Sequence, residues 1–101
     1  MVRFLGLKRS TDPKKKYMAE FETDAGRTKT VHFGDAASKD YTLHSPMERE
    51  ARKANYISRH KAREDWNDPT TPAALSRWIL WNRPTVKASL ADYKRRFGFT
   101  A

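Results

Sequence analysis

Two alternating segments joined by a turn constrain the fold of this chain more than any other feature. Residues 16–22 and 28–33 alternate between apolar and polar side chains, which is the period of a half-buried β-strand. Residues 24–27, Asp-Ala-Gly-Arg, supply a turn between them. The sequence therefore predicts a β-hairpin. Its inward-facing side chains are expected to be Tyr17, Ala19, Phe21, Val31 and Phe33.

A third strand is predicted at residues 2–8, because two strands alone are only marginally stable in water. Residues 10–13, Ser-Thr-Asp-Pro, form a turn-favouring break between this strand and the hairpin. The first third of the chain, residues 2–34, is therefore expected to be an antiparallel β-meander.

Helical signals dominate the rest of the chain. Residues 45–48, Ser-Pro-Met-Glu, match a capping box with proline at the first helical position and predict a helix over 46–64. The Pro-containing loop at 67–72 ends this helix, and Thr71 can cap a second one that runs to residue 81.

Pro84 separates the second predicted helix from a third one, and Gly98 can cap the C-terminal end of that third helix. A chain of 101 residues is expected to form one domain with one core. The predicted fold class is α+β. A small N-terminal antiparallel sheet at 2–34 is expected to pack with three C-terminal helices at 45–98.

The charge balance predicts an anionic partner. Lysine and arginine number 21 against 12 aspartates and glutamates, giving a net charge of +9. Nucleic acid is the first candidate; an acidic protein surface, anionic lipid and charge kept for solubility are the alternatives. The absence of cysteine excludes disulfides and thiolate zinc sites. The longest strongly apolar run, 78–81, is too short to cross a bilayer, and residues 1–7 are too short for the core of a signal peptide. A soluble protein that is not secreted is therefore expected.

The first predicted helix carries a candidate phosphate-binding face. A helical wheel separates a cationic sector from a sector that can pack. Arginine presents a planar fork that matches phosphate oxygens, whereas the alternative is a solvated face partly neutralised by Glu48, Glu50 and Glu64. The cationic sector contains Arg49, Arg52, Lys53, Tyr56, Arg59, His60 and Arg63. The packing sector contains Met47, Ala51, Ala54, Ile57 and Ala62.

Two further basic clusters are candidates for secondary contacts with phosphates. Lys14, Lys15 and Lys16 stand at the entrance to a strand, where they can instead protect a sheet from edge-to-edge pairing. Arg95 and Arg96 lie near the end of the third helix, where interaction with the helix dipole is an equally physical explanation.

The three tryptophans are predicted to stabilise the fold. Aromatic platforms that stack on unpaired bases occur in single-strand binders. Trp78 and Trp81 instead lie three residues apart among aliphatic residues, a pattern typical of a core. Trp66 is expected to close the corner between the first two helices, with its indole N–H bonded to a loop group.

No group of residues predicts catalysis or metal binding. His32, His44 and His60 are scattered, and none belongs to a pair with metal-ligand spacing. The carboxylates at 64–68 suit a helix end and an Asp-Pro turn better than a nuclease centre. The serines lack a neighbouring base and no glycine-rich phosphate loop is present. The sequence therefore predicts a protein that is not an enzyme, with no catalytic residues, cofactor or metal.

Several motifs of this chain are more particular than generic strands and helices. They are YISRHKAREDWNDPT at 56–70, ALSRWILW at 74–81, TVHFG at 30–34, DYTLH at 40–44 and YKRRF at 93–97. Together they resemble a family of small basic proteins of unassigned function from giant viruses and other nucleocytoplasmic large DNA viruses. The resemblance spans roughly residues 16–98, implies a viral setting and brings no catalytic residues.

The combined expectation is a viral protein that binds nucleic acid, with duplex DNA favoured. Cationic side chains would neutralise backbone phosphates, which position a protein without specifying a sequence, so genome condensation or packaging is favoured. The alternative is a structural virion component, such as a minor capsid or internal scaffold protein, that binds acidic capsid surfaces. Either role places the protein in the virion or in the viral factory of the infected-cell cytoplasm.

Overall fold

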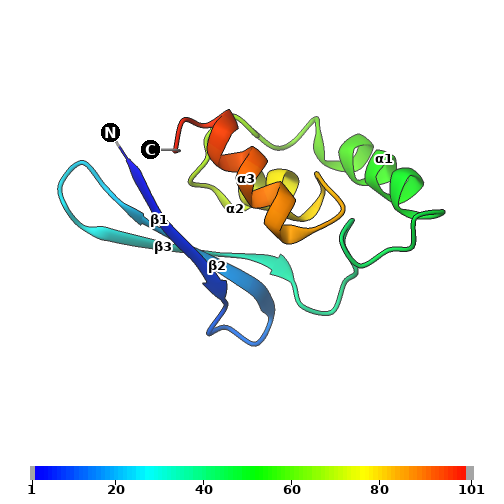
Figure 1. Ribbon diagram of the computed structural model, residues 1–101, viewed down its shortest axis with the longest axis horizontal. Helices are drawn as coiled ribbons and strands as arrows, with labels where there is room; N and C mark the ends of the chain where they lie inside the picture. The colour runs from blue at the N-terminus through cyan, green and yellow to red at the C-terminus, as the bar shows by residue number, and fades with distance from the viewer. Residues whose placement is uncertain (1, 100–101) are drawn as a thin grey trace.

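The computed structural model describes residues 2–99 and has an α+β fold, as predicted. A three-stranded sheet comes first along the chain, and the helices follow it in sequence (Figure 1). In chain order the elements are β1 (Arg3–Arg9), β2 (Lys15–Glu22), β3 (Thr28–Asp35), α1 (Arg49–His60), α2 (Pro72–Leu75), the π-helix η1 (Ser76–Leu80) and α3 (Val86–Arg96).

The sheet confirms the predicted meander. Its strand order is β1-β2-β3 and both pairings are antiparallel. Ala19 lies opposite Val31 in the register of β2 and β3. The hairpin turn closes where the N–H of Thr23 donates to the carbonyl of Arg27 at 2.8 Å, with Gly26 at a φ of 79°.

One face of the sheet packs against the C-terminal helices and forms the core. Every inward-facing aromatic and aliphatic side chain from β2 and β3 is buried or half-buried, as predicted. Burying such a side chain fully stabilises the fold by about 1.5–3 kcal/mol. The fully buried contributors from the helical part are Leu75, Ile79, Leu80 and Tyr93.

The predicted second helix is divided in two. The Thr71 side chain caps α2 by accepting from the N–H of Ala74 at 3.2 Å, as predicted. After α2 the chain widens into η1, where the N–H of Trp81 donates to the carbonyl of Ser76 at 3.1 Å, five residues back. Trp78 and Trp81 pack against the core but are only half-buried, so the core prediction for them is correct in part.

The first helix is shorter than the predicted 46–64 at both ends, and at its start the capping box does not form. The backbone carbonyl of Ser45, not its hydroxyl, accepts from the N–H groups of Glu48 and Arg49, at 3.0 and 2.9 Å. No side chain caps α1. Residues 45–48 therefore form a turn, and the helix begins at Arg49 and ends at His60.

The predicted division of α1 into a cationic face and a packing face is correct only in part. Arg52, Arg59 and Arg63 are exposed as predicted, but the residue that packs most fully comes from the cationic sector. Figure 1 shows α1 at one end of the molecule, beyond the sheet that α3 covers. Its buried residue is Tyr56, which belongs to the predicted cationic sector, whereas Met47 just before the helix is 95% exposed. Ala51 and Ala54 are exposed as well. The reason is that long cationic side chains can bury their stems while an aromatic ring provides most of the packing.

The C-terminal end of α3 is capped as predicted. Gly98 adopts a φ of 73°, its N–H donates to the carbonyl of Arg95, and the N–H of Phe99 donates to that of Lys94. These two bonds define a Schellman motif. Phe99 thereby folds back onto the ring of Phe4 in β1, with ring centroids 5.9 Å apart.

Gly34 occupies a position that no other residue can fill without strain. Its φ is 82°, and a Cβ there would lie 2.7 Å from Cδ1 of the buried Leu80. We expect Gly34→Ala to lower the free energy of unfolding by about 1–3 kcal/mol from backbone strain and by about 1–3 kcal/mol more from overpacking. Chemical denaturation measures this loss.

Gly26→Ala is the matched control for this prediction. Gly26 has a φ of 79° but nothing within 4 Å of the position of a Cβ. Its substitution should therefore produce the backbone strain alone. Equal losses for the two variants would show that the approach of Leu80 does not constrain Gly34.

Candidate nucleic-acid interface

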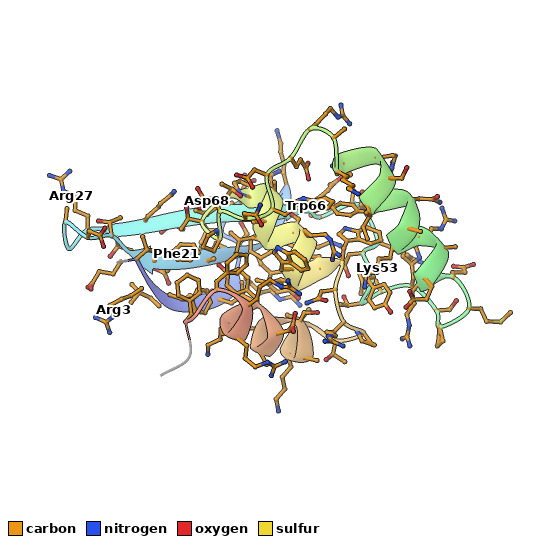
Figure 2. All side chains as sticks on the ribbon, turned by 90° about the horizontal axis from the view of Figure 1, so that it is seen from above. Arg3, Phe21, Arg27, Lys53, Trp66 and Asp68 are labelled. Atoms are coloured by element: carbon orange, nitrogen blue, oxygen red, sulfur yellow. The ribbon has the colours of Figure 1, made fainter. Side chains whose placement is uncertain are left out.

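Three of the predicted phosphate contacts on α1 make contacts that attach the helix to the rest of the protein. Lys53 Nζ donates to the carbonyl of Asn82 at 3.0 Å and lies 5.0 Å from the centre of the Tyr41 ring. Burial lowers the pKa of Lys53, and the nearby Arg77 guanidinium lowers it further. Figure 2 shows Lys53 on the side of α1 that faces the helical body.

Arg49 and His60 are the other two inward-facing residues of this set. The Arg49 guanidinium lies 5.5 Å from the centre of the Tyr41 ring. The His60 ring stacks on Tyr56 at 4.3 Å, and its Nδ1 lies 2.7 Å from a carboxylate oxygen of Glu64. Arg49, Lys53 and His60 are therefore already engaged within the fold and leave Arg52, Arg59 and Arg63 exposed.

Arg52 and Arg59 border a groove that the structure opens beside α1. The groove has a volume of about 580 Å³. Among the residues that the structure describes, no aspartate or glutamate lines it. Within residues 2–99, Lys39, Arg52 and Arg59 form no ion pair, so their charges are available to a ligand. The lining residues are Ser38, Lys39, His44, Arg52, Asn55, Ser58, Arg59 and Trp81.

The lysine triplet contains one largely buried side chain and two exposed ones. Lys16 Nζ lies 2.6 Å from Oδ2 of Asp40, and the two side chains are only 13% and 5% exposed. A buried ion pair of this kind cannot offer its cation to a phosphate without leaving the carboxylate unpaired. Lys16 is therefore a structural residue, whereas Lys14 and Lys15 are exposed, and Lys15 lines a cleft next to the groove.

The predicted contacts at the end of α3 surround a single carboxylate. Arg95 and Arg96 lie 3.5 and 3.7 Å from oxygens of Asp92, and Arg83 lies 3.6 Å from it. A hydrogen bond from Asn82 lowers the pKa of Asp92, and the arginines lower it further. Arg95 and Arg96 line neither the groove nor the neighbouring cleft.

The neighbouring cleft has a volume of about 660 Å³ and shares Ser38, Lys39, Arg59 and Trp81 with the groove. It lies between α1, the end of β3 and the α2–η1 segment. Lys39 and Arg59 thus stand where the two hollows meet.

The aromatic rings beside these hollows stack on one another. Tyr56 lies parallel to Trp81, with ring centroids 4.7 Å apart and an interplanar angle of 9°, and His60 stacks on Tyr56. Trp66 donates its indole N–H to Glu64 at 3.1 Å at the corner after α1, as predicted (Figure 2). These rings hold α1 in place.

One functional candidate, Lys39, was not identified from the sequence. It lies in a polar connection without periodicity, so no pattern indicates a role for it. Arg77 lies between Trp78 and Trp66, at 4.2 and 5.4 Å from the ring centres, and donates to the carbonyl of Trp81 at 2.8 Å. Arg77 lines neither hollow, so its contacts stabilise the fold.

Among residues 2–99, no helix is long and apolar enough to span a membrane. The same part of the chain contains no cluster of three or more His, Asp or Glu side chains arranged to hold a metal ion.

A protein-family model described as "Family of unknown function (DUF5754)" matches residues 5–60. The match runs from β1 to the end of α1 and includes Lys39, Arg52 and Arg59. No curated protein and no solved structure matches the chain.

Proposed function

This chain belongs to DUF5754, a family of unknown function, and we propose that it binds nucleic acid, with duplex DNA favoured. The binding is non-enzymatic and directed at backbone phosphates. The observation that supports this proposal is the groove beside α1, because its cations have no carboxylate partner among the described residues.

The side chains around the groove suit phosphate chemistry. Arg52 and Arg59 can each present two parallel N–H groups to phosphate oxygens, and Lys39 adds a point charge. The amide of Asn55 and the hydroxyl of Ser58 are neutral donors of the kind that also contact DNA backbones. Contacts of this type position a protein on a duplex without reading its sequence.

The stacked aromatic rings favour a duplex over a fully single-stranded ligand. Single-strand binders offer open aromatic faces to successive bases. Here Tyr56 lies between His60 and Trp81, so its ring faces are occupied within the fold. The exposed arginines and Lys39 therefore remain as the main means of binding.

The resemblance to small basic proteins of large DNA viruses suggests the biological role. A net charge of +9 with low sequence specificity suits condensation or packaging of a viral genome, in the virion or in the viral factory.

The direct test is a titration of the protein with duplex DNA, duplex RNA and an acidic polypeptide at several salt concentrations. We expect unrelated DNA duplexes to bind with similar affinities that fall steeply with salt, because each phosphate contact releases counterions. Strong preference for one short site in the presence of competitor DNA would contradict non-specific binding. Tighter binding of the acidic polypeptide than of DNA would contradict a nucleic-acid function.

A structural role in the virion is the second candidate, and a specific surface favours it. Met47, Ala51 and Ala54 expose an apolar strip on the outer side of α1, and Leu43 nearby is 57% exposed. Such a strip suits a protein partner better than a phosphate backbone. Ordered, symmetric positions in a capsid shell would favour this role over genome binding.

A further inference from the structure

We propose that the cleft beside the groove receives one unpaired nucleotide of the bound nucleic acid. This inference rests on the proposed function and adds a ligand class to it: duplexes that carry an unpaired nucleotide at an end. The phosphate lies at the rim formed by Lys39 and Arg59, and the nucleoside enters the cleft.

The first argument is the position of the cations. Lys39 and Arg59 line both hollows, whereas Arg52 lines the groove alone and Lys15 lines the cleft but not the groove. A backbone that follows the groove therefore passes the mouth of the cleft. Any nucleotide attached to a phosphate at Lys39 and Arg59 has the cleft beside it.

The second argument is that the acidic residues of the cleft are already satisfied. Asp40 pairs with Lys16 at 2.6 Å, and Glu64 lies 2.7 Å from His60. Asp35 accepts from the backbone N–H of Ala37 at 3.0 Å and from the hydroxyl of Ser38 at 2.9 Å. Asp40, which is paired with a lysine, opposes an incoming phosphate less than an unpaired carboxylate would.

The third argument is the size and composition of the cleft. A volume of about 660 Å³ lies within the range of about 300–1,000 Å³ typical of small-molecule sites. The side chains of Pro72 and Ala73 form an apolar wall, and the Ser76 hydroxyl makes no hydrogen bond within the described residues. An apolar wall with a few polar groups and a cationic rim suits a base joined to a phosphate.

A paired base cannot enter such a hollow, because it is stacked inside the duplex and must first be extruded at an energetic cost. An unpaired terminal nucleotide does not carry this cost. The cleft therefore distinguishes duplexes with a single-stranded extension from blunt duplexes, although the groove binds the backbone of both.

The experiment compares three forms of one duplex by fluorescence anisotropy at fixed salt: blunt, with a short single-stranded extension, and with an abasic extension of the same length. We expect the base-bearing extension to bind at least about fivefold more tightly than the abasic one, because a base seated in the cleft packs against its apolar side chains. The abasic form controls for the added phosphates.

Ala73→Phe tests the location, because a larger side chain there fills the cleft. It should abolish the gain from the base and leave blunt-duplex affinity unchanged. Ala91→Phe, at an exposed position on α3, is the matched control and should preserve the gain. A gain that survives in Ala73→Phe would overturn the proposal, and so would equal binding of the base-bearing and abasic extensions. The comparison between extensions decides the question even if Ala73→Phe fails to fold.

The two levels of the proposal fail in different ways. Failure to bind any of the three duplexes removes the proposed function itself. Binding of all three with equal affinity keeps backbone recognition and removes only the role of the cleft.

Discussion

Replacing Lys39, Arg52 and Arg59 together with glutamine is expected to weaken binding to duplex DNA by about a hundredfold at low salt. The three side chains line one groove and have no ion-pair partner within residues 2–99. An exposed ion pair contributes at most about 1 kcal/mol, so three contacts account for a loss of this size. The slope of log affinity against log salt should also become shallower by roughly 3, since each phosphate contact contributes about 0.9.

The control must remove the same charge elsewhere. Arg27, Lys61 and Lys87 are exposed and line neither hollow, and Figure 2 shows Arg27 at the far tip of the β2–β3 hairpin. Their replacement with glutamine leaves the same net charge as the groove variant. If both triple variants lose the same affinity and slope, the protein binds through its overall charge and the groove has no special role.

Tyr56→Ala is expected to detach α1 from the rest of the protein. The Tyr56 ring is buried and stacks on Trp81 with centroids 4.7 Å apart. Truncating a buried aromatic side chain costs about 3–5 kcal/mol. Because this ring is the buried residue of α1, the loss should appear as local opening. Hydrogen exchange of the α1 amides should become roughly a hundredfold faster while the strands remain protected.

Ser58→Ala provides the comparison, since Ser58 is an exposed residue of the same helix. Exchange rates in that variant should match those of the parent protein. If Tyr56→Ala leaves exchange in α1 unchanged, the helix is held by Lys53, Arg49 and the flanking loops instead. If it unfolds the whole protein, α1 and the core form one cooperative unit.

The fold was largely predictable because its main signals are local. Alternation in β2 and β3, the glycine turn between them, the Thr71 cap and the Gly98 cap depend on residues close in sequence. The widening of the helix at η1 was not predictable, because it depends on how Ile79 and Leu80 fit against the sheet. The periodicity of apolar residues does not reveal where an α-helix widens into a π-helical turn.

The surroundings of the candidate side chains on α1 were harder to predict than the fold. A helical wheel treats every arginine and lysine as solvent-facing, yet Arg49 and Lys53 pack over Tyr41. The wheel also contains no information about partners outside the helix, such as Trp81. Arg52 and Arg59 remain good candidates because they flank the buried sector without belonging to its centre.

The π-helical turn can be understood as a one-residue insertion that sets the position of Trp81 and, through it, of α1 and the groove beside it. A residue advances an α-helix by about 100°, so deleting one residue from η1 would rotate Trp81 away from its position opposite Tyr56. The helix that carries Arg52 and Arg59 would then lose its stacking contact with Trp81. The sheet would keep its own aromatic contacts, such as that between Tyr17 and Phe33. In evolutionary terms, gaining or losing this single residue would create or remove the groove while the sheet stayed folded.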